Sequence, residues 1–170
     1  MSARLSRPIS VRRLSKEERV TVEATPEERA AIADALDLVA VDSLTAEISL
    51  RPWKKEGVRV TGVVKAAVVQ SCIVTLEPVP STVDETFELR LHPDAVLSTT
   101  IDVDPEAEDP PEPLETDTVD VGAIALEHFA LGLDPYPRAP GAVFEAEEDE
   151  PEDEEPSPFA VLEALKNQPN

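Results

Sequence analysis

The chain has 170 residues, of which 41% are hydrophobic, and a net charge of −21 at pH 7. That length suits one domain with some additional tail, and the sequence has no run of the ~20 apolar residues that a membrane-spanning helix needs. The absence of such a run predicts that the protein has no membrane partner. The single cysteine cannot form an internal disulfide, which is typical of a reducing compartment, so the sequence predicts a cytoplasmic protein.

The negative charge is concentrated in the second part of the chain. Residues 1–93 carry 13 Lys or Arg and 14 Asp or Glu, a net charge of −1, whereas residues 94–170 carry 2 and 22, a net charge of −20. A negative field repels phosphate backbones and attracts basic proteins. The second part is therefore a poor candidate for binding RNA and a better one for attracting a basic protein.

The first predicted elements are a strand from Ile9 to Leu14 and a helix from Pro26 to about Leu38. Thr25 can cap this helix, proline suits its first position, and Glu28 completes a capping box. Apolar residues at helical spacing then form one face: Ile32, Ala35, Leu36 and Val39.

Alternating apolar and polar residues predict four strands after this helix, over residues 44–50, 58–65, 67–76 and 83–91. Proline-containing turns are expected between them, one of them at residues 78–80. Successive strands with short connections form an antiparallel meander, and the helix is the natural cover for its apolar face.

Residues 1–140 are expected to form a single domain that includes an acidic, proline-rich loop at about 102–118 and a second helix from about Val119 to Leu131. That helix is apolar enough to be buried on most sides. Residues 141–157 form an acidic linker that we expect to be disordered, and residues 158–170 a short amphipathic helix. The sequence thus predicts an α+β fold: a curved antiparallel sheet, open or partly closed into a barrel, with two or three helices and a disordered acidic segment.

The chemically reactive side chains are not arranged as a catalytic or metal site. Cys72 would need a base or a cationic neighbour to become nucleophilic, and the spacing of His92 and His128 brings neither to it. Zinc usually takes four clustered ligands, and the carboxylates lie in solvated runs. We predict no enzyme activity, no cofactor and no small-molecule substrate, with Cys72 buried and inert in a strand.

Two stretches carry a more specific pattern. In Val69–Val79 a cysteine is followed by Leu-Glu-Pro, and Thr75 stands between them. Asp120-Val121-Gly122 opens a helix that leads to Asp134-Pro135-Tyr136-Pro137-Arg138, and Pro158–Leu162 follows. This order resembles the YceD family of large ribosomal RNA subunit accumulation proteins, in which a second cysteine often stands at the position of Thr75. Without that cysteine, a metal or redox role for a cysteine pair has no support here.

The resemblance implies a role in the accumulation of large-subunit ribosomal RNA, and hence in assembly of the large subunit, without catalysis. We expect a basic ribosomal protein or assembly factor as the partner. The candidate partner-binding residues are Cys72, Glu77, Pro78, Tyr136, Pro137, Arg138, Phe159 and Leu162. Each of them could equally serve only to maintain the fold.

Two alternatives stay open at the level of sequence. The basic front half could bind ribosomal RNA directly, through candidate contacts at Arg4, Arg7, Arg12 and Arg13 and further cations at Arg51, Lys54 and Lys55. The four N-terminal arginines could equally balance the acidic tail. The protein could also be an acidic adaptor unrelated to ribosomes.

Overall fold

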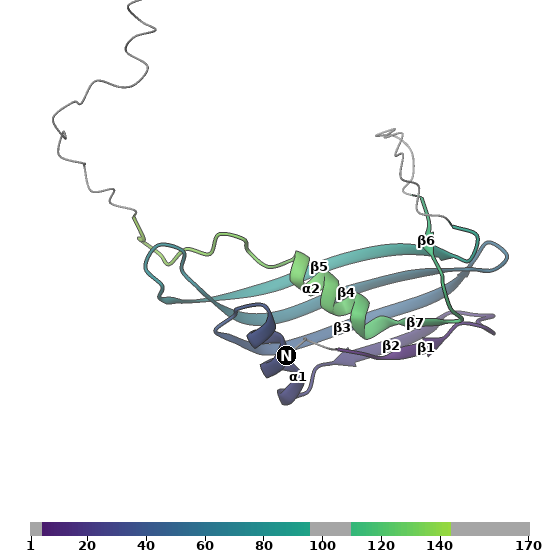
Figure 1. Ribbon diagram of the computed structural model, residues 1–170, viewed down its shortest axis with the longest axis horizontal. Helices are drawn as coiled ribbons and strands as arrows, with labels where there is room; N and C mark the ends of the chain where they lie inside the picture. The colour runs from purple at the N-terminus through teal and green to yellow at the C-terminus, as the bar shows by residue number, and fades with distance from the viewer. Residues whose placement is uncertain (1–4, 96–109, 144–170) are drawn as a thin grey trace, which may run out of the picture.

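The computed structural model describes residues 5–95 and 110–143. Long strands form a curved sheet, and a helix lies across one of its faces (Figure 1). The elements in chain order are β1 Pro8–Ser10, β2 Glu18–Glu23, α1 Pro26–Ala35, β3 Ala40–Trp53, β4 Gly57–Ser71, β5 Pro78–His92, β6 Glu112–Pro113, β7 Thr118–Asp120 and α2 Val121–Leu131.

The main sheet has the order β2-β3-β4-β5-β6, and a second, two-stranded sheet pairs β1 with β7. All these strand pairs are antiparallel except β5 with β6, which is parallel. The predicted α+β fold, with two helices and a mostly antiparallel sheet, is confirmed. The sheet stays open between its edge strands β2 and β6, so the alternative of a partly closed barrel is wrong.

The three central strands are longer than the sequence pattern indicated. The two strands expected over residues 58–65 and 67–76 are one strand, β4, because no turn residue interrupts the alternation and its pairing with β3 continues past Lys65. Cys72 therefore lies just beyond a strand rather than within one. Pro78 and Pro80 do not form a turn but begin β5, where the side away from β4 has no partner strand among the described residues. Proline is tolerated there because no ladder hydrogen bond is lost.

Helix α1 begins as predicted. The Thr25 hydroxyl accepts a hydrogen bond from the Glu28 N–H, and the Glu28 carboxylate accepts one from the Thr25 N–H, which completes the capping box. The helix ends at Ala35 instead of Leu38, because Asp37 adopts a left-handed backbone with φ 54°. It packs against β3 and buries Ile32.

Helix α2, rather than α1, is the main cover of the sheet, and it lies across β4 and β5 (Figure 1). It begins at Val121, because Val119 belongs to β7. The prediction that this helix is buried on most sides is largely confirmed. Val121, Gly122, Ala125 and Phe129 are buried, and Ile124 and Leu126 pack partly against the core. The exposed residues form one stripe, Ala123, Glu127 and Leu131, of which Leu131 is 70% exposed.

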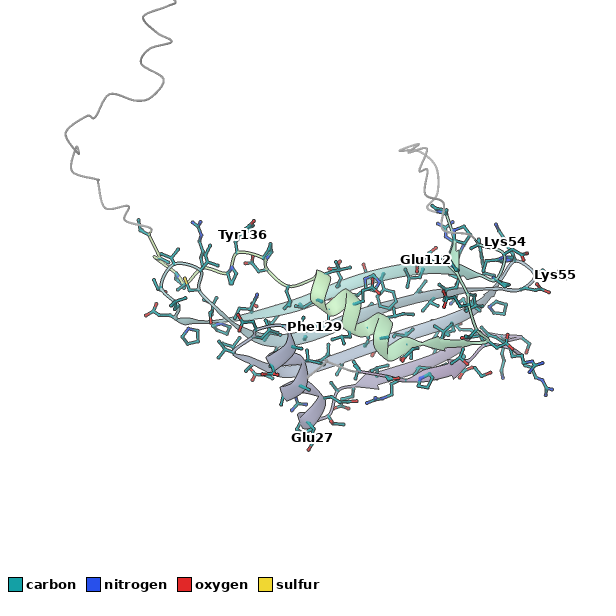
Figure 2. All side chains as sticks on the ribbon, viewed as in Figure 1. Glu27, Lys54, Lys55, Glu112, Phe129 and Tyr136 are labelled. Atoms are coloured by element: carbon teal, nitrogen blue, oxygen red, sulfur yellow. The ribbon has the colours of Figure 1, made fainter. Side chains whose placement is uncertain are left out.

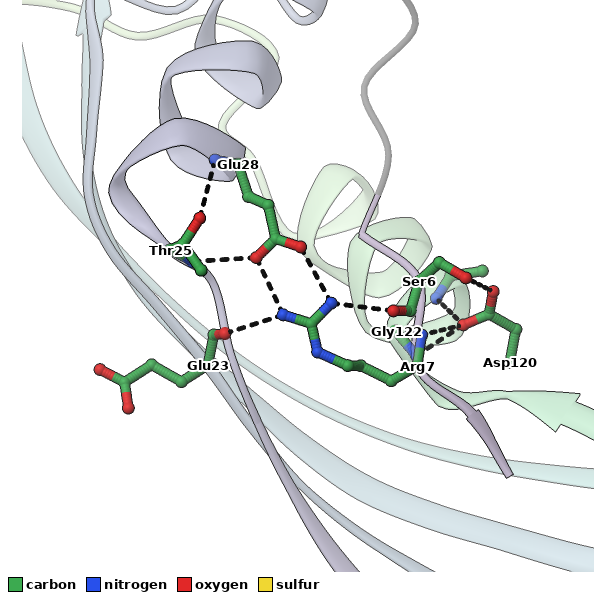
Figure 3. A network of polar contacts seen from close by, with 8 residues as sticks. Ser6, Arg7, Glu23, Thr25, Glu28, Asp120 and Gly122 are labelled. Atoms are coloured by element: carbon green, nitrogen blue, oxygen red, sulfur yellow. Dashed lines mark hydrogen bonds and ion pairs between the residues drawn. The ribbon is translucent and has the colours of Figure 1, made fainter. Parts of the chain in front are cut away.

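The N-terminal segment is tied to the starts of both helices (Figure 3). The Arg7 guanidinium donates two hydrogen bonds of 2.9 Å to the Glu28 carboxylate of α1. Asp120, the N-cap of α2, accepts hydrogen bonds from the Ser6 hydroxyl and from the N–H groups of Arg7 and Gly122. This network fixes the entry of the chain, and the strand expected over residues 9–14 shortens to β1.

Two further differences concern the less regular parts of the chain. Strand β2 was not predicted, although Val20 and Val22 alternate with polar residues in it. Within the loop expected at 102–118, residues 110–118 contain β6 and the first residue of β7, while residues 102–109 lie outside the described residues. So do nearly all of the predicted acidic linker and the whole of the predicted C-terminal helix. Neither helix of the described part is long and apolar enough to cross a membrane.

Candidate partner-binding surface

The β4–β5 hairpin closes through the loop 72–77, which begins with Cys72. The Cys72 side chain is fully buried, and its Sγ accepts hydrogen bonds from three backbone N–H groups, those of Ala139 at 3.3 Å and of Val74 and Thr75 at 3.4 Å. These hydrogen bonds, that of Ala139 foremost, lower the pKa of the Cys72 thiol to about 6. The sulfur thus acts as a structural acceptor that holds the loop in place.

Between residues 5–95 and 110–143, three hydrogen bonds join the hairpin to the segment after α2, and the bond from Ala139 is one of them. The Ile73 N–H donates to the Pro137 carbonyl at 2.9 Å. The Gln70 side chain, which is buried on the inner face of β4, donates from Nε2 to the Asp134 carbonyl at 2.9 Å. The two stretches that carried the family resemblance, more than 60 residues apart, therefore meet at one end of the sheet.

The loop geometry turns one apolar side chain outward. The Cys72 N–H donates to the Glu77 carbonyl at 2.8 Å and closes the loop, while Leu76 adopts a left-handed backbone with φ 61°. A leucine at such an angle is unusual, because side chains with a Cβ are strained there. Leu76 is nevertheless 78% exposed, so among the described residues it is not part of the core.

Two further apolar side chains join Leu76 at this end. Ile73 is 46% exposed and Tyr136 is 70% exposed, and Figure 2 shows Tyr136 on the segment that follows α2. The Ile73–Pro137 hydrogen bond places the two chain segments in direct contact. We define the hairpin-tip surface by Ile73, Leu76, Glu77, Tyr136 and Arg138, all of which are exposed.

The predicted partner-binding residues thus divide into two groups. Cys72 and Pro137 are buried and hold the hairpin tip together, whereas Glu77, Pro78, Tyr136 and Arg138 are exposed at it. Phe159 and Leu162 lie outside the described residues. Sequence reasoning missed Gln70, Ile73 and Leu76 as parts of this site. Gln70 did carry a signal, since it is a polar residue at an inward position of an otherwise apolar strand.

The predicted RNA contacts have different surroundings. Arg7 is occupied by the Glu28 carboxylate and by the carbonyls of Ser6 and Glu23. Arg12 is exposed and lies 3.6 Å from the Asp117 carboxylate, and Arg13 is exposed. Arg4 lies outside the described residues. The hydrogen bonds of Arg7 to Glu28 and to the two carbonyls thus show a structural role for Arg7 that the sequence alone did not reveal.

The two histidines pack against aromatic rings. His128 stacks on Phe87 with ring centroids 4.3 Å apart, and His92 meets Trp53 edge-on at 6.1 Å. In residues 5–95 and 110–143, no three or more His, Cys, Asp or Glu side chains are grouped so that they could hold a metal ion.

Comparison with known proteins gives one clear result. No curated protein and no solved structure matches the chain. A family model does match, over residues 60–166, which include most of β4, all of β5 and α2, and both stretches of the hairpin tip. Since this match covers more than half of the chain, the protein belongs to the family described as large ribosomal RNA subunit accumulation protein YceD.

Proposed function

We propose that this protein supports the accumulation of large-subunit ribosomal RNA as a non-catalytic factor that binds a protein partner through the hairpin-tip surface. The observation that carries the proposal is the convergence of two distant stretches, both inside the family match, on one solvent-exposed apolar cluster. Exposed apolar groups rimmed by polar residues are typical of protein interaction sites.

The arrangement of the cluster favours binding over catalysis. Leu76 lies in the loop 72–77 and Tyr136 in the segment after α2, and the bonds to Cys72 Sγ and to the Pro137 carbonyl fix these two backbones to each other. A surface fixed in advance loses little conformational entropy when a partner binds. Aromatic residues such as tyrosine contribute strongly at the centres of interfaces.

The charge of the chain indicates the kind of partner. Glu77 and Asp134 flank the apolar cluster, and the strongly acidic sequence after Val143 continues from the same segment. Complementary charge speeds association and selects partners. We therefore propose a basic protein, such as a ribosomal protein or an assembly factor, that offers an apolar side chain to the hairpin tip.

Complementation of a strain that lacks the gene tests this function. The wild-type chain and the variants Leu76→Ser, Tyr136→Ser and Leu131→Ser would be compared by sucrose gradients and by the amount of large-subunit ribosomal RNA. We expect reduced large-subunit particles with Leu76→Ser and Tyr136→Ser. Leu131→Ser is the matched control, because Leu131 is as exposed as Tyr136 but belongs to α2.

Normal large-subunit particles and RNA in the strain without the gene would contradict the function itself, and would favour an adaptor unrelated to ribosomes. A clear defect in that strain that Leu76→Ser and Tyr136→Ser fully correct would contradict only the assignment of the hairpin-tip surface.

A further inference from the structure

Three arginines lie in one row across the outer face of the sheet, the face opposite α2. In the strand register, Arg51 of β3 pairs with Arg59 of β4, and Arg59 pairs with Arg90 of β5. Like charges directly opposite each other destabilise an antiparallel pair. The pairing of arginine with arginine therefore does not itself stabilise the sheet, and a binding role would give the row a use.

Two carboxylates hold these arginines and Arg19 of β2 in position. The Glu17 Oε1 accepts hydrogen bonds from Arg19 Nε at 2.9 Å and Arg51 Nη2 at 3.0 Å. The Glu88 Oε1 lies 3.5 Å from Arg59 Nε and 3.4 Å from Arg90 Nε. A guanidinium has five N–H groups, and among the described residues Arg19 and Arg51 each donate through one nitrogen only. Their remaining donors are available to an anion.

The outer face is open around this row. None of the side chains on the outer face of β3, β4 and β5 is buried. A hollow of about 540 Å³ lies beside the row and is lined by guanidinium groups, hydroxyls and two carboxylates. Its polar lining consists of Glu17, Arg19, Thr21, Glu47, Ser49, Arg51, Thr61 and Thr86.

The β3–β4 turn extends the cationic area and adds an aromatic ring. Lys54 holds its ammonium 4.2 Å from the centre of the Trp53 ring, and Lys55 follows it at the end of the sheet (Figure 2). We define the arginine face by its six cations and one aromatic residue: Arg19, Arg51, Trp53, Lys54, Lys55, Arg59 and Arg90. The carboxylates beside them are Glu17, Glu47, Glu56 and Glu88, so six positive and four negative charges give a local charge of +2 in a chain of −21.

We propose that the arginine face binds single-stranded RNA. Guanidinium forks match phosphate oxygens, and arginine held by a carboxylate is already oriented for such contacts. An aromatic ring beside a cationic groove offers a stacking platform for an unpaired base, which at Trp53 would replace the contact with the Lys54 ammonium. This face lies at the opposite end of the long strands from the hairpin-tip surface, and so adds a second ligand to the proposed function.

Fluorescence anisotropy with a labelled single-stranded uridine 20-mer tests the proposal on the full chain. The double variant Arg51→Gln/Arg59→Gln should bind at least ~10-fold more weakly, and the slope of log affinity against log salt should fall by about 1.4, which is two phosphate contacts. The matched control is Arg29→Gln/Lys65→Gln, with the same change of charge, since Arg29 donates to the Ala24 carbonyl and Lys65 lies 4.0 Å from the Asp84 carboxylate, six residues along β4 from Arg59. Thermal unfolding of each variant verifies the fold.

The control should bind RNA like the wild-type chain. Contacts between cations and phosphates are stronger at low salt. The proposal is therefore overturned if the wild-type chain does not bind the RNA even at about 50 mM salt. It is also overturned if both double variants lose affinity equally, or if a labelled polyglutamate peptide binds the arginine face while RNA does not. Leu76→Ser should leave RNA binding unchanged. A failure of the RNA-binding proposal can therefore be distinguished from a failure of the proposed protein binding at the hairpin-tip surface.

Discussion

Replacing Gly122 by alanine tests whether the Asp120-Val121-Gly122 stretch serves the fold. A Cβ added at Gly122 would lie 2.7 Å from the Leu5 carbonyl oxygen and 2.8 Å from the Arg7 backbone nitrogen. Both are backbone atoms of the segment that crosses α2, so no side chain can rotate away. We expect either this segment or α2 to shift, with loss of the bond from the Arg7 N–H to Asp120.

Two opposing effects set the magnitude. Overpacking of a well-packed site costs about 1–3 kcal/mol, and alanine in a helix is favoured over glycine by up to about 1 kcal/mol. The second effect is smaller near a helix terminus, where Gly122 lies. We therefore expect Gly122→Ala to lower the free energy of unfolding by about 1–2 kcal/mol, measured by urea denaturation at pH 7.

Ala123→Gly is the matched control, because Ala123 is the next residue of α2 and is exposed. This variant reports the preference for alanine over glycine in the same helical turn, without a nearby backbone. If Gly122→Ala stabilises the protein by the amount that Ala123→Gly destabilises it, the contact with Leu5 imposes no constraint and the reasoning is wrong.

Three further predictions concern the packing, the cap and the thiol. Phe129→Ala should lower the free energy of unfolding by about 3–5 kcal/mol in urea, since Phe129 is fully buried under α2; a loss below ~1 kcal/mol would mean that α2 is not the cover. Burial alone would raise the pKa of Asp120, but its hydrogen bonds from Ser6, Arg7, Ala123 and Gly122 together lower it. Asp120→Ala should therefore cost about 1–2 kcal/mol and Asp120→Asn less, by thermal unfolding, and equal losses would exclude the capping role. Because the fold lowers the pKa of Cys72 from 9.0 to about 6, it favours the thiolate, so the free energy of unfolding should rise from pH 6 to 9 and this contribution should disappear below pH 6. The Cys72→Ser variant should lack this rise in the free energy of unfolding. A thiolate absorbance at 240 nm that titrates near pH 9 in the wild-type protein would contradict the lowered pKa of Cys72.

The sequence predicted well what depends on neighbouring residues. The capping box of Thr25 and Glu28 lies within four residues, and it forms as expected. Alternation located the three long strands but not their ends, because period-two patterning looks the same in one strand of 15 residues as in two shorter ones, and β2 was missed. The prolines at 78 and 80 misled for a related reason, since whether a proline breaks a strand depends on which side has a partner.

The candidate sites depended on contacts that no local pattern contains. Family resemblance drew attention to Cys72 and Tyr136, but only the fold shows that the first is a buried acceptor and the second an exposed contact. The bond from Arg7 to Glu28 joins residues 21 positions apart and removes Arg7 from the free cations. The arginine row results from strand register, which the sequence alone could not supply.

The two proposed surfaces lie far enough apart to act independently. The 15 residues of β4 run from the arginine face to the hairpin tip, and at about 3.4 Å per residue they span about 50 Å. Charges in solution are screened over about 8–10 Å at 0.10–0.15 M salt. The carboxylates of Glu77 and Asp134 at the hairpin tip therefore have little effect on phosphates at Arg51 and Arg59. A chain with a net charge of −21 can thus present a cationic face to RNA at one end while it attracts a basic protein at the other.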